Sequence, residues 1–273
     1  MHSSTEKTTA ATSAAQHKAM RDGLFVVTCA ARTGSSMLMN LLQSHPDVMS
    51  HMEIFNPARV EGLSGVYRTR LAEEPRLEQR MRDLRKHAPA AFLYKLAFDT
   101  QGRRHAGFKW KYEELLLPMF AGARAVLLAD TDIKIVHLRR RNLLRRYLSW
   151  WVANHVTGIT MTRIGEKKPA VPPVLLDPVI CQADFEMTLR SAEFVQHLFR
   201  KHQVLNVSYE DLTGEMAETA HAGLLEFLGI SPRPLRTVIA KLADDDLAQS
   251  IANFDDLKAH FQNTPFIQYF QEA

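Results

Sequence analysis

The sequence predicts a single α/β domain in which helices flank a parallel β-sheet. Short apolar, β-branched runs alternate with helical segments along most of the chain, which is the order that right-handed β-α-β crossovers produce. The first run, residues 24–29, is apolar almost throughout, as in a strand buried on both faces. We expect a flexible tail over residues 1–22, which are rich in Ser, Thr and Ala, and a folded domain over residues 23–273.

The other expected elements follow from the same patterns. Helices are expected over residues 37–42, 62–90, 143–155, 184–202 and 209–229. Strands are expected over residues 92–98, 106–111, 133–138 and 204–207. Residues 158–178 contain four prolines and little periodicity, which predicts a long loop. The arginines of segment 62–90 are expected to face solvent.

Composition excludes several classes of protein. With 46% hydrophobic and 23% charged residues, the chain is neither disordered nor fibrous. A net charge of +4 is too small to predict nucleic-acid binding. The two cysteines, Cys29 and Cys181, are too few and too far apart for a disulfide framework or a zinc site. No integral membrane segment or secretory signal is recognisable, so we expect a cytoplasmic protein.

A loop of small residues joins the first strand to the first helix. Backbone N–H groups in such a loop point at one spot, and the helix N-terminus reinforces it, so the spot attracts an anion. Arg32 supplies forked donors, Gly34 permits a tight turn, and hydroxyl groups come from Thr33, Ser35 and Ser36.

The loop differs from the magnesium-dependent phosphate loop of nucleoside triphosphatases. It lacks the Lys of the G-x-x-x-x-G-K-[ST] pattern, since Ser35 stands there. The strand over residues 133–138 ends in arginines instead of a magnesium-binding Asp. We therefore expect direct binding of phosphate and sulfate oxygens without a metal ion.

A second anion site is predicted where the strand over residues 133–138 gives way to a helix. Five guanidinium groups lie within eight residues there, and most of them are expected to be solvated. Arg141 stands at the strand–helix junction and Ser149 lies eight residues further on. A strand–turn–helix geometry allows both side chains to reach one ligand.

These two sites together resemble the sulfotransferases that use 3′-phosphoadenosine 5′-phosphosulfate (PAPS), especially the bacterial carbohydrate-type members. Their 5′-phosphosulfate loop matches residues 32–36, and their 3′-phosphate signature matches Arg141-Asn142 and Ser149. Further similarity, at residues 107–112, 209–212, 227–229 and 251–254, extends the likeness from residue 24 to about 270. The resemblance implies a P-loop-like fold, PAPS as co-substrate, and a carbohydrate or other small molecule with a hydroxyl group as acceptor.

Transfer to a hydroxyl group also needs a general base. The resemblance to bacterial carbohydrate sulfotransferases implies Glu53, which we expect at the carboxyl edge of a strand neighbouring the first one. His51 is the alternative base, and Lys111 is a third candidate as well as a possible charge stabiliser. Arg32 would stabilise the charge that develops on the leaving group.

Two other functions remain open from the sequence: a divergent P-loop kinase, and a non-catalytic protein that binds nucleotides or polyanions. The acceptor and the oligomeric state are not encoded in these motifs. Trp110, Trp150 and Trp151 could stack on a sugar or adenine ring, although core packing is the commoner role of such side chains.

Overall fold

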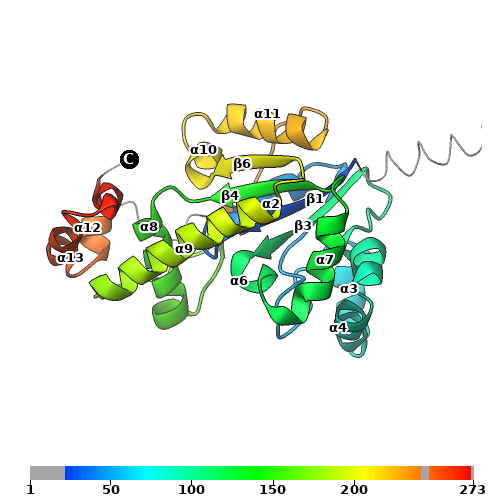
Figure 1. Cartoon of the computed structure of the whole chain (residues 1–273), viewed down its shortest axis with the longest axis horizontal. Helices are drawn as coiled ribbons and strands as arrows, with labels where there is room; N and C mark the ends of the chain where they lie inside the picture. The colour runs from blue at the N-terminus through cyan, green and yellow to red at the C-terminus, as the bar shows by residue number, and fades with distance from the viewer. Residues whose placement is uncertain (1–21, 241–245, 272–273) are drawn as a thin grey trace, which may run out of the picture.

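A five-stranded parallel sheet forms the centre of the computed structural model, which describes residues 22–240 and 246–271. The strand order is β2-β3-β1-β4-β6, so β1 lies in the middle (Figure 1). The strands are β1 (Leu24–Cys29), β2 (Val48–His51), β3 (His105–Lys111), β4 (Lys134–Arg139) and β6 (Val204–Ser208). A separate antiparallel pair consists of β5 (Thr162–Arg163) and β7 (Ile239–Ala240).

Helices cover both faces of the sheet. One face packs against α2 (Ser35–Gln43), α10 (Tyr209–Thr213) and α11 (Ala217–Leu228). The other packs against α5 (Pro89–Phe92), α7 (Ala121–Ala129) and α9 (Pro178–Leu198). Figure 1 shows α11 and α7 on opposite sides of the sheet. Among the described residues, no helix has the length and apolar character needed to cross a membrane.

The remaining elements extend these layers. They are α3 (Val66–Glu73), α4 (Leu77–His87), η1 (Leu93–Ala97), α6 (Tyr112–Leu115), η2 (Pro118–Phe120), α8 (Leu143–Trp151), η3 (Val152–Thr157), α12 (Leu247–Ser250), α13 (Phe254–Phe261) and η4 (Pro265–Phe270). A separate apolar cluster joins α8 and α9 to α13 and η4 at the end of the molecule away from α3 and α4 (Figure 1).

Strand β1 confirms the prediction of a strand buried on both faces. Leu24 and Val26 pack into the core beneath α7 and α9, whereas Phe25, Val27 and Cys29 pack into the core beneath α2 and α11. Because side chains alternate along a strand, an almost continuous apolar run fills both cores at once. This central strand delivers the following loop to the carboxyl edge of the sheet.

The strand expected over residues 92–98 is wrong. The segment is helical, with α5 passing into the π-helical turn η1. Phe92, Leu93, Leu96 and Ala97 are buried while Tyr94 is exposed, which is the spacing of one helix face and not of a strand. Pro89 at the first helical position also favours this helix start.

Three other expectations differ in their boundaries. Helix α9 begins at Pro178, six residues before the expected start, because the Asp177 side chain caps it by accepting from the N–H groups of Val179 and Ile180 at 2.8 and 3.1 Å. The expected helix over 209–229 is two helices, α10 and α11. The loop over 158–178 contains β5. The tail expected over 1–22 lies outside the described residues, apart from Asp22.

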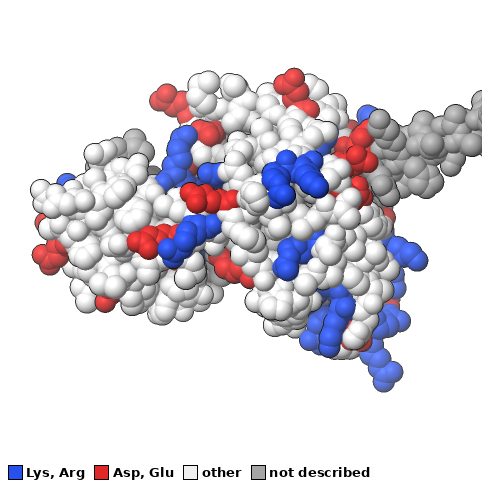
Figure 2. All heavy atoms as spheres, in the orientation of Figure 1, with Lys and Arg blue, Asp and Glu red and all other residues white. Residues whose placement is uncertain are grey.

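The basic segment 62–90 forms α3 and α4, and Figure 2 shows Lys and Arg side chains gathered over these helices. Most of its arginines are exposed, as expected, but Arg85 is 4% exposed. Its guanidinium donates to the carbonyl oxygen of Ile54 at 2.5 Å and lies 4.8 Å from the centre of the Phe120 ring. Arg85 therefore fixes the loop that follows Glu53.

An aromatic cluster also fixes this loop. The Phe55 ring stacks on Trp110 with centroids 3.8 Å apart and meets Phe92 and Phe120 edge-on at 5.4 and 5.3 Å. Both Phe55 and Trp110 are fully buried. Phe55 thus anchors the chain two residues after Glu53.

We predict that Phe55→Ala destabilises the protein by about 3–5 kcal/mol, because it leaves a cavity in a close-packed aromatic cluster. Urea denaturation of the purified variant measures this. Phe194→Ala is the control: Phe194 is 52% exposed, so its loss should change stability by about 0.5 kcal/mol or less. A loss below about 1 kcal/mol for Phe55→Ala would show that this cluster does not hold the loop.

Candidate functional site

A cavity of about 610 Å³ opens at the carboxyl edge of the sheet. Residues that follow or end all five strands line it: Arg32 after β1, Glu53 after β2, Lys109 and Lys111 at the end of β3, Arg140 after β4 and Tyr209 after β6. This edge, beside the central strand from which the chain runs to either side, is where open α/β sheets bind ligands.

The loop between β1 and α2 lines this cavity and has an unusual backbone conformation. Arg32 and Gly34 have left-handed backbone conformations, with φ values of 65° and 84°. A Cβ atom on Gly34 would lie 2.3 Å from the Tyr209 ring, so the close approach of α10 requires glycine. From outside the loop, Arg140 donates to the carbonyl oxygen of Arg32 at 3.3 Å and Arg146 to that of Ala31 at 3.2 Å. Among the described residues, no side chain caps the start of α2, so its first N–H groups are available to an anion.

The Arg32 side chain links the two predicted anion sites. Its Nε donates to the hydroxyl of Ser149 at 3.1 Å, and its Nη1 donates to the carbonyl oxygen of Thr160. Burial, together with the positive charge of Arg140, lowers the pKa of Arg32. A cation that is buried beside another cation is stabilised by a bound anion.

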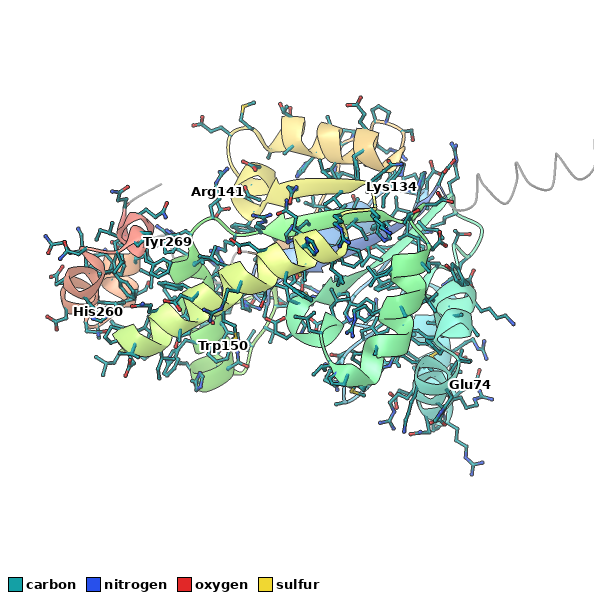
Figure 3. All side chains as sticks on the ribbon, viewed as in Figure 1. Glu74, Lys134, Arg141, Trp150, His260 and Tyr269 are labelled. Atoms are coloured by element: carbon teal, nitrogen blue, oxygen red, sulfur yellow. The ribbon has the colours of Figure 1, made fainter. Side chains whose placement is uncertain are left out.

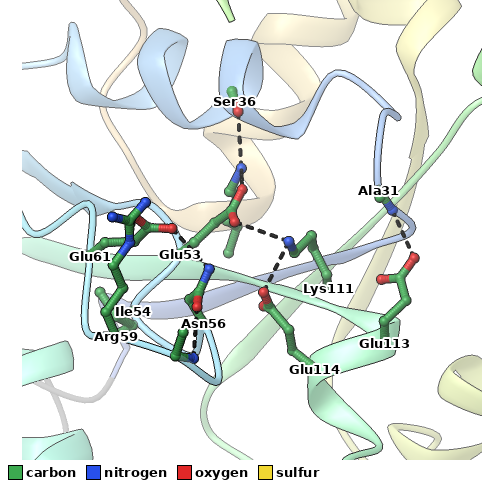
Figure 4. A network of polar contacts seen from close by, with 12 residues as sticks. Ala31, Ser36, Glu53, Ile54, Asn56, Arg59, Glu61, Lys111, Glu113 and Glu114 are labelled. Carbon is green, nitrogen blue, oxygen red and sulfur yellow. Dashed lines mark hydrogen bonds and ion pairs between the residues drawn. The ribbon is translucent and has the colours of Figure 1, made fainter. Parts of the chain in front are cut away.

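Glu53 is held between two lysines. Its Oε1 lies 2.8 Å from Lys109 Nζ and its Oε2 lies 3.0 Å from Lys111 Nζ (Figure 4). Lys109 Nζ also donates to the hydroxyl of Ser36 at 2.9 Å, which connects Glu53 to the start of α2. Burial alone would raise the pKa of Glu53, but the charges and hydrogen bonds of Lys109 and Lys111 outweigh it and lower the pKa to about 2.

The alternative bases are placed less favourably. His51 is fully buried, does not line the cavity, and accepts from the Ser64 N–H at Nδ1. Burial lowers the pKa of His51 to about 4. Lys111 lines the cavity, but although burial favours its neutral form, Glu114 and Glu53 raise its pKa well above the ordinary value. These carboxylates therefore favour its charged form, which suits a role as a cation better than a role as a base.

Two of the residues predicted to bind the sulfuryl donor, Thr33 and Arg141, do not line the cavity. The hydroxyl of Thr33 donates to the carbonyl oxygen of Ala30 at 2.9 Å within the loop. The Arg141 side chain is 63% exposed and pairs with Asp211 at 2.8 Å. In Figure 3, Arg141 lies beside α10 and Trp150 lies toward the far end of α8. The other predicted site residues line one cavity together: Arg32, Gly34, Ser35, Ser36, Glu53, Lys111 and Ser149.

Several cavity residues were not identified from the sequence. Arg140 is one of five arginines in the basic run, and the sequence does not show which of them turns toward the loop after β1. In the structure Arg140 lines the cavity, and its guanidinium lies 4.8 Å from the centre of the Tyr209 ring. Of the three tryptophans, only Trp150 lines the cavity, while Trp110 is in the core and Trp151 stacks on His155. The segment after Glu53 contributes Asn56, Arg59 and Glu61.

A family model described as "Sulfotransferase family" matches residues 24–234, which include the strands and loops just described. The chain belongs to the sulfotransferase family. It is also similar to nodulation protein H of Rhizobium meliloti strain 1021, with 26% identity over 260 residues, covering 94% of this chain and 98% of that one. Nodulation protein H of Rhizobium tropici is 24% identical over 249 residues, covering 90% and 92% of the two chains.

Among solved structures, mouse sulfotransferase SULT7A1 in complex with PAP matches over 92% of this chain and 76% of that chain, with 12% identity and a TM-score of 0.35. Within the described part of this sulfotransferase, no three His, Cys, Asp or Glu side chains gather as metal ligands would. Both cysteines are free and buried, and burial raises the pKa of Cys29 to about 11.

We predict that the stabilisation contributed by the Glu53 carboxylate disappears in acid. Its pKa is about 2 in the folded protein against an ordinary value of 4.5, so this stabilisation is complete above about pH 5 and falls as the pH drops toward 2. Thermal denaturation of wild type and Glu53→Gln from pH 7 to pH 3 measures it. The difference in stability should stay constant near neutrality and shrink in acid; a difference that is independent of pH would show that the two lysines do not stabilise this carboxylate.

Proposed function

We propose that this sulfotransferase moves the sulfuryl group of PAPS to a hydroxyl group of a carbohydrate, with Glu53 as the general base. One observation carries the proposal: a single cavity joins the loop after β1 to a lysine-bound carboxylate, through the contacts Ser36–Lys109 and Lys109–Glu53. Family membership favours sulfuryl transfer over the phosphoryl transfer of the kinase alternative.

The residues present fit a donor with anionic groups at both ends. Gly34, Ser35 and Ser36 would hold the 5′-phosphosulfate at the N-terminus of α2, where Arg32 adds a positive charge. Ser149 would bind the 3′-phosphate, since its hydroxyl already lies beside Arg32. Arg141 would join it by exchanging Asp211 for the phosphate, and an exposed ion pair of this kind contributes only about 0–1 kcal/mol.

The chemistry divides between the two ends of the cavity. At the acceptor end, Glu53 takes the proton of the hydroxyl group as its oxygen forms a bond to sulfur. The bond from sulfur to the bridging oxygen breaks, and its electron pair stays on the 5′-phosphate of the leaving 3′,5′-bisphosphate. Arg32, Lys109 and the loop N–H groups stabilise the charge that develops there, and losing one such donor typically lowers the rate about 10²- to 10³-fold.

Aromatic and polar side chains that line the cavity suit a carbohydrate acceptor. Trp150 lines the cavity and lies nearly parallel to Tyr147, with centroids 5.8 Å apart, so the Trp150 ring is held in place as a stacking surface. The segment after Glu53 carries an amide and charged groups of both signs. Asn56 donates to Glu61 at 3.0 Å, and Arg59 pairs with Glu61. Such groups form the hydrogen bonds that sugar hydroxyl groups need. A cytoplasmic location is also part of the proposal and rests on the two free thiols.

We predict that the wild-type protein transfers radiolabelled sulfate from PAPS to at least one member of a panel of oligosaccharides in the presence of EDTA. Glu53→Gln should lower kcat about 10²- to 10⁴-fold, because the amide cannot accept the proton. Stabilisation by 3′,5′-ADP in a melting assay should persist in the variant. Asp256→Asn, a charge loss on the exposed part of α13, is the matched control and should keep full activity.

Other outcomes would overturn this function. ATP binding and turnover that both require magnesium would favour the kinase alternative. Normal binding of 3′,5′-ADP by wild type and Glu53→Gln, with no transfer to any acceptor by either, would favour a non-catalytic nucleotide-binding protein.

We also predict that Arg141→Ala weakens binding of 3′,5′-ADP about tenfold or more, because a charge-assisted hydrogen bond to the 3′-phosphate is lost. Binding of adenosine 5′-phosphate, which has no 3′-phosphate, should be unchanged. Isothermal titration of both nucleotides measures the two affinities. An equal loss for both nucleotides, or no loss for either, would exclude Arg141 from the 3′-phosphate site.

A further inference from the structure

The buried carboxylate of Glu114 has no role in the function proposed above. It follows β3 in α6, its side chain is 5% exposed, and its Oε1 lies 3.0 Å from Lys111 Nζ (Figure 4). Its Oε2 is buried without a hydrogen-bond partner among the described residues. Burying a carboxylate this way is unfavourable, and burial raises the pKa of Glu114. The neighbouring Glu113 points elsewhere and accepts from the N–H of Ala31 at 3.2 Å.

Lys111 is therefore shared between two carboxylates. Its Nζ lies 3.0 Å from Glu53 Oε2 and 3.0 Å from Glu114 Oε1. With Lys109 on the other oxygen of Glu53, two lysines and two carboxylates form a cluster whose charges cancel. Arg85 from α4 also acts on Glu114, and Arg32 from the phosphate loop acts on Glu53. These two guanidinium groups lie outside the neutral cluster of four, so each carboxylate is surrounded by more positive than negative charge.

This charge arrangement affects the basicity of Glu53. A carboxylate that is paired with two lysines, neither of which has another carboxylate partner, is a weak base. Each cation favours the ionised form of Glu53 and opposes its protonation. General base catalysis becomes slower as the base becomes weaker. A second carboxylate on Lys111 partly offsets the positive charge of that lysine. It also repels the negative charge of Glu53. Both effects favour uptake of a proton by Glu53.

We propose that Glu114 is a positioning residue that holds Lys111 between two carboxylates and thereby makes Glu53 a stronger base toward the acceptor hydroxyl than the two lysines alone would leave it. The proposal rests on the proposed function of Glu53. Glu114 does not touch the reacting atoms and acts through Lys111. Its negative charge also keeps the cluster neutral before transfer, so that proton uptake leaves one positive charge beside the sulfuryl group as the acceptor oxygen attacks.

Glu114→Gln tests this, because glutamine keeps the size of the side chain and can still accept from Lys111 but removes the charge. We expect kcat for sulfate transfer from PAPS to the oligosaccharide acceptor to fall about three- to tenfold. The solvent deuterium isotope effect on kcat should increase, since proton transfer to a weaker base limits the rate more fully. The KM values and the stabilisation by 3′,5′-ADP should change less than about twofold.

Two further variants complete the test. Glu114→Asp keeps the charge and should retain most of the wild-type kcat and isotope effect, which also keeps the proposal testable if the glutamine variant does not fold. Glu218→Gln, a charge loss on the exposed face of α11, should behave as wild type.

Separate results identify which assignment fails. Loss of activity in Glu53→Gln with unchanged kcat and isotope effect in Glu114→Gln would overturn the role of Glu114 alone. Parallel losses of kcat, 3′,5′-ADP binding and melting temperature in Glu114→Gln, or an aspartate variant as slow as the glutamine variant, would assign Glu114 a merely structural role. Wild-type turnover by Glu53→Gln would overturn the base, and the role of Glu114 with it.

Discussion

The contact of Lys109 with both Ser36 and Glu53 is the constraint on which the site depends. Lys109 is nearly buried, with 3% of its side chain exposed, and an unpaired ammonium group there would be strongly unfavourable. It therefore fixes the distance between the start of α2, where we propose that the donor's 5′-phosphosulfate binds, and the carboxylate that follows β2. Because β3 lies between β1 and β2, a side chain at its carboxyl end can contact both of these segments. In the proposed function, the sulfuryl donor and the acceptor hydroxyl meet beside this lysine.

Much of the fold follows from local sequence patterns. The sequence predicts the positions of β1, with its almost continuous apolar run, of β4 and β6, and of the small-residue loop, each to within one residue. The segment at Phe92 could not be assigned in this way, since a short apolar run fits a strand or a buried helix equally well until its neighbours are known. The sequence also predicts that the strand before Glu53 neighbours β1. This prediction is wrong, because β3 lies between β2 and β1. Strand order depends on contacts between distant segments, which local patterns do not contain.

At the site, too, some residues follow from local sequence patterns and others depend on contacts between distant segments. The loop residues and Ser149 are found through spacing, and Glu53 through its place after a crossover and its resemblance to a known family. The choice between Arg140 and Arg141 depends on how the chain turns at the end of β4 and on the carboxylates of α10, which engage Arg141. The alternation of β3 does not reveal what lies opposite Lys109, so the sequence alone does not show that this lysine joins Ser36 to Glu53. Glu114 gives no signal in the sequence, since a carboxylate in the first turn of a helix is common on protein surfaces.

A crystal structure with 3′,5′-ADP tests the central claim most directly, namely that one cavity brings the sulfuryl donor to the carboxylate through Lys109. We predict that the 5′-phosphate lies within hydrogen-bonding distance of the N–H groups at the start of α2, with Lys109 between it and Glu53, and that its open side faces the cavity wall formed by Trp150. A nucleotide bound elsewhere, or one whose 5′-phosphate lies away from Lys109 and Glu53, would contradict the claim.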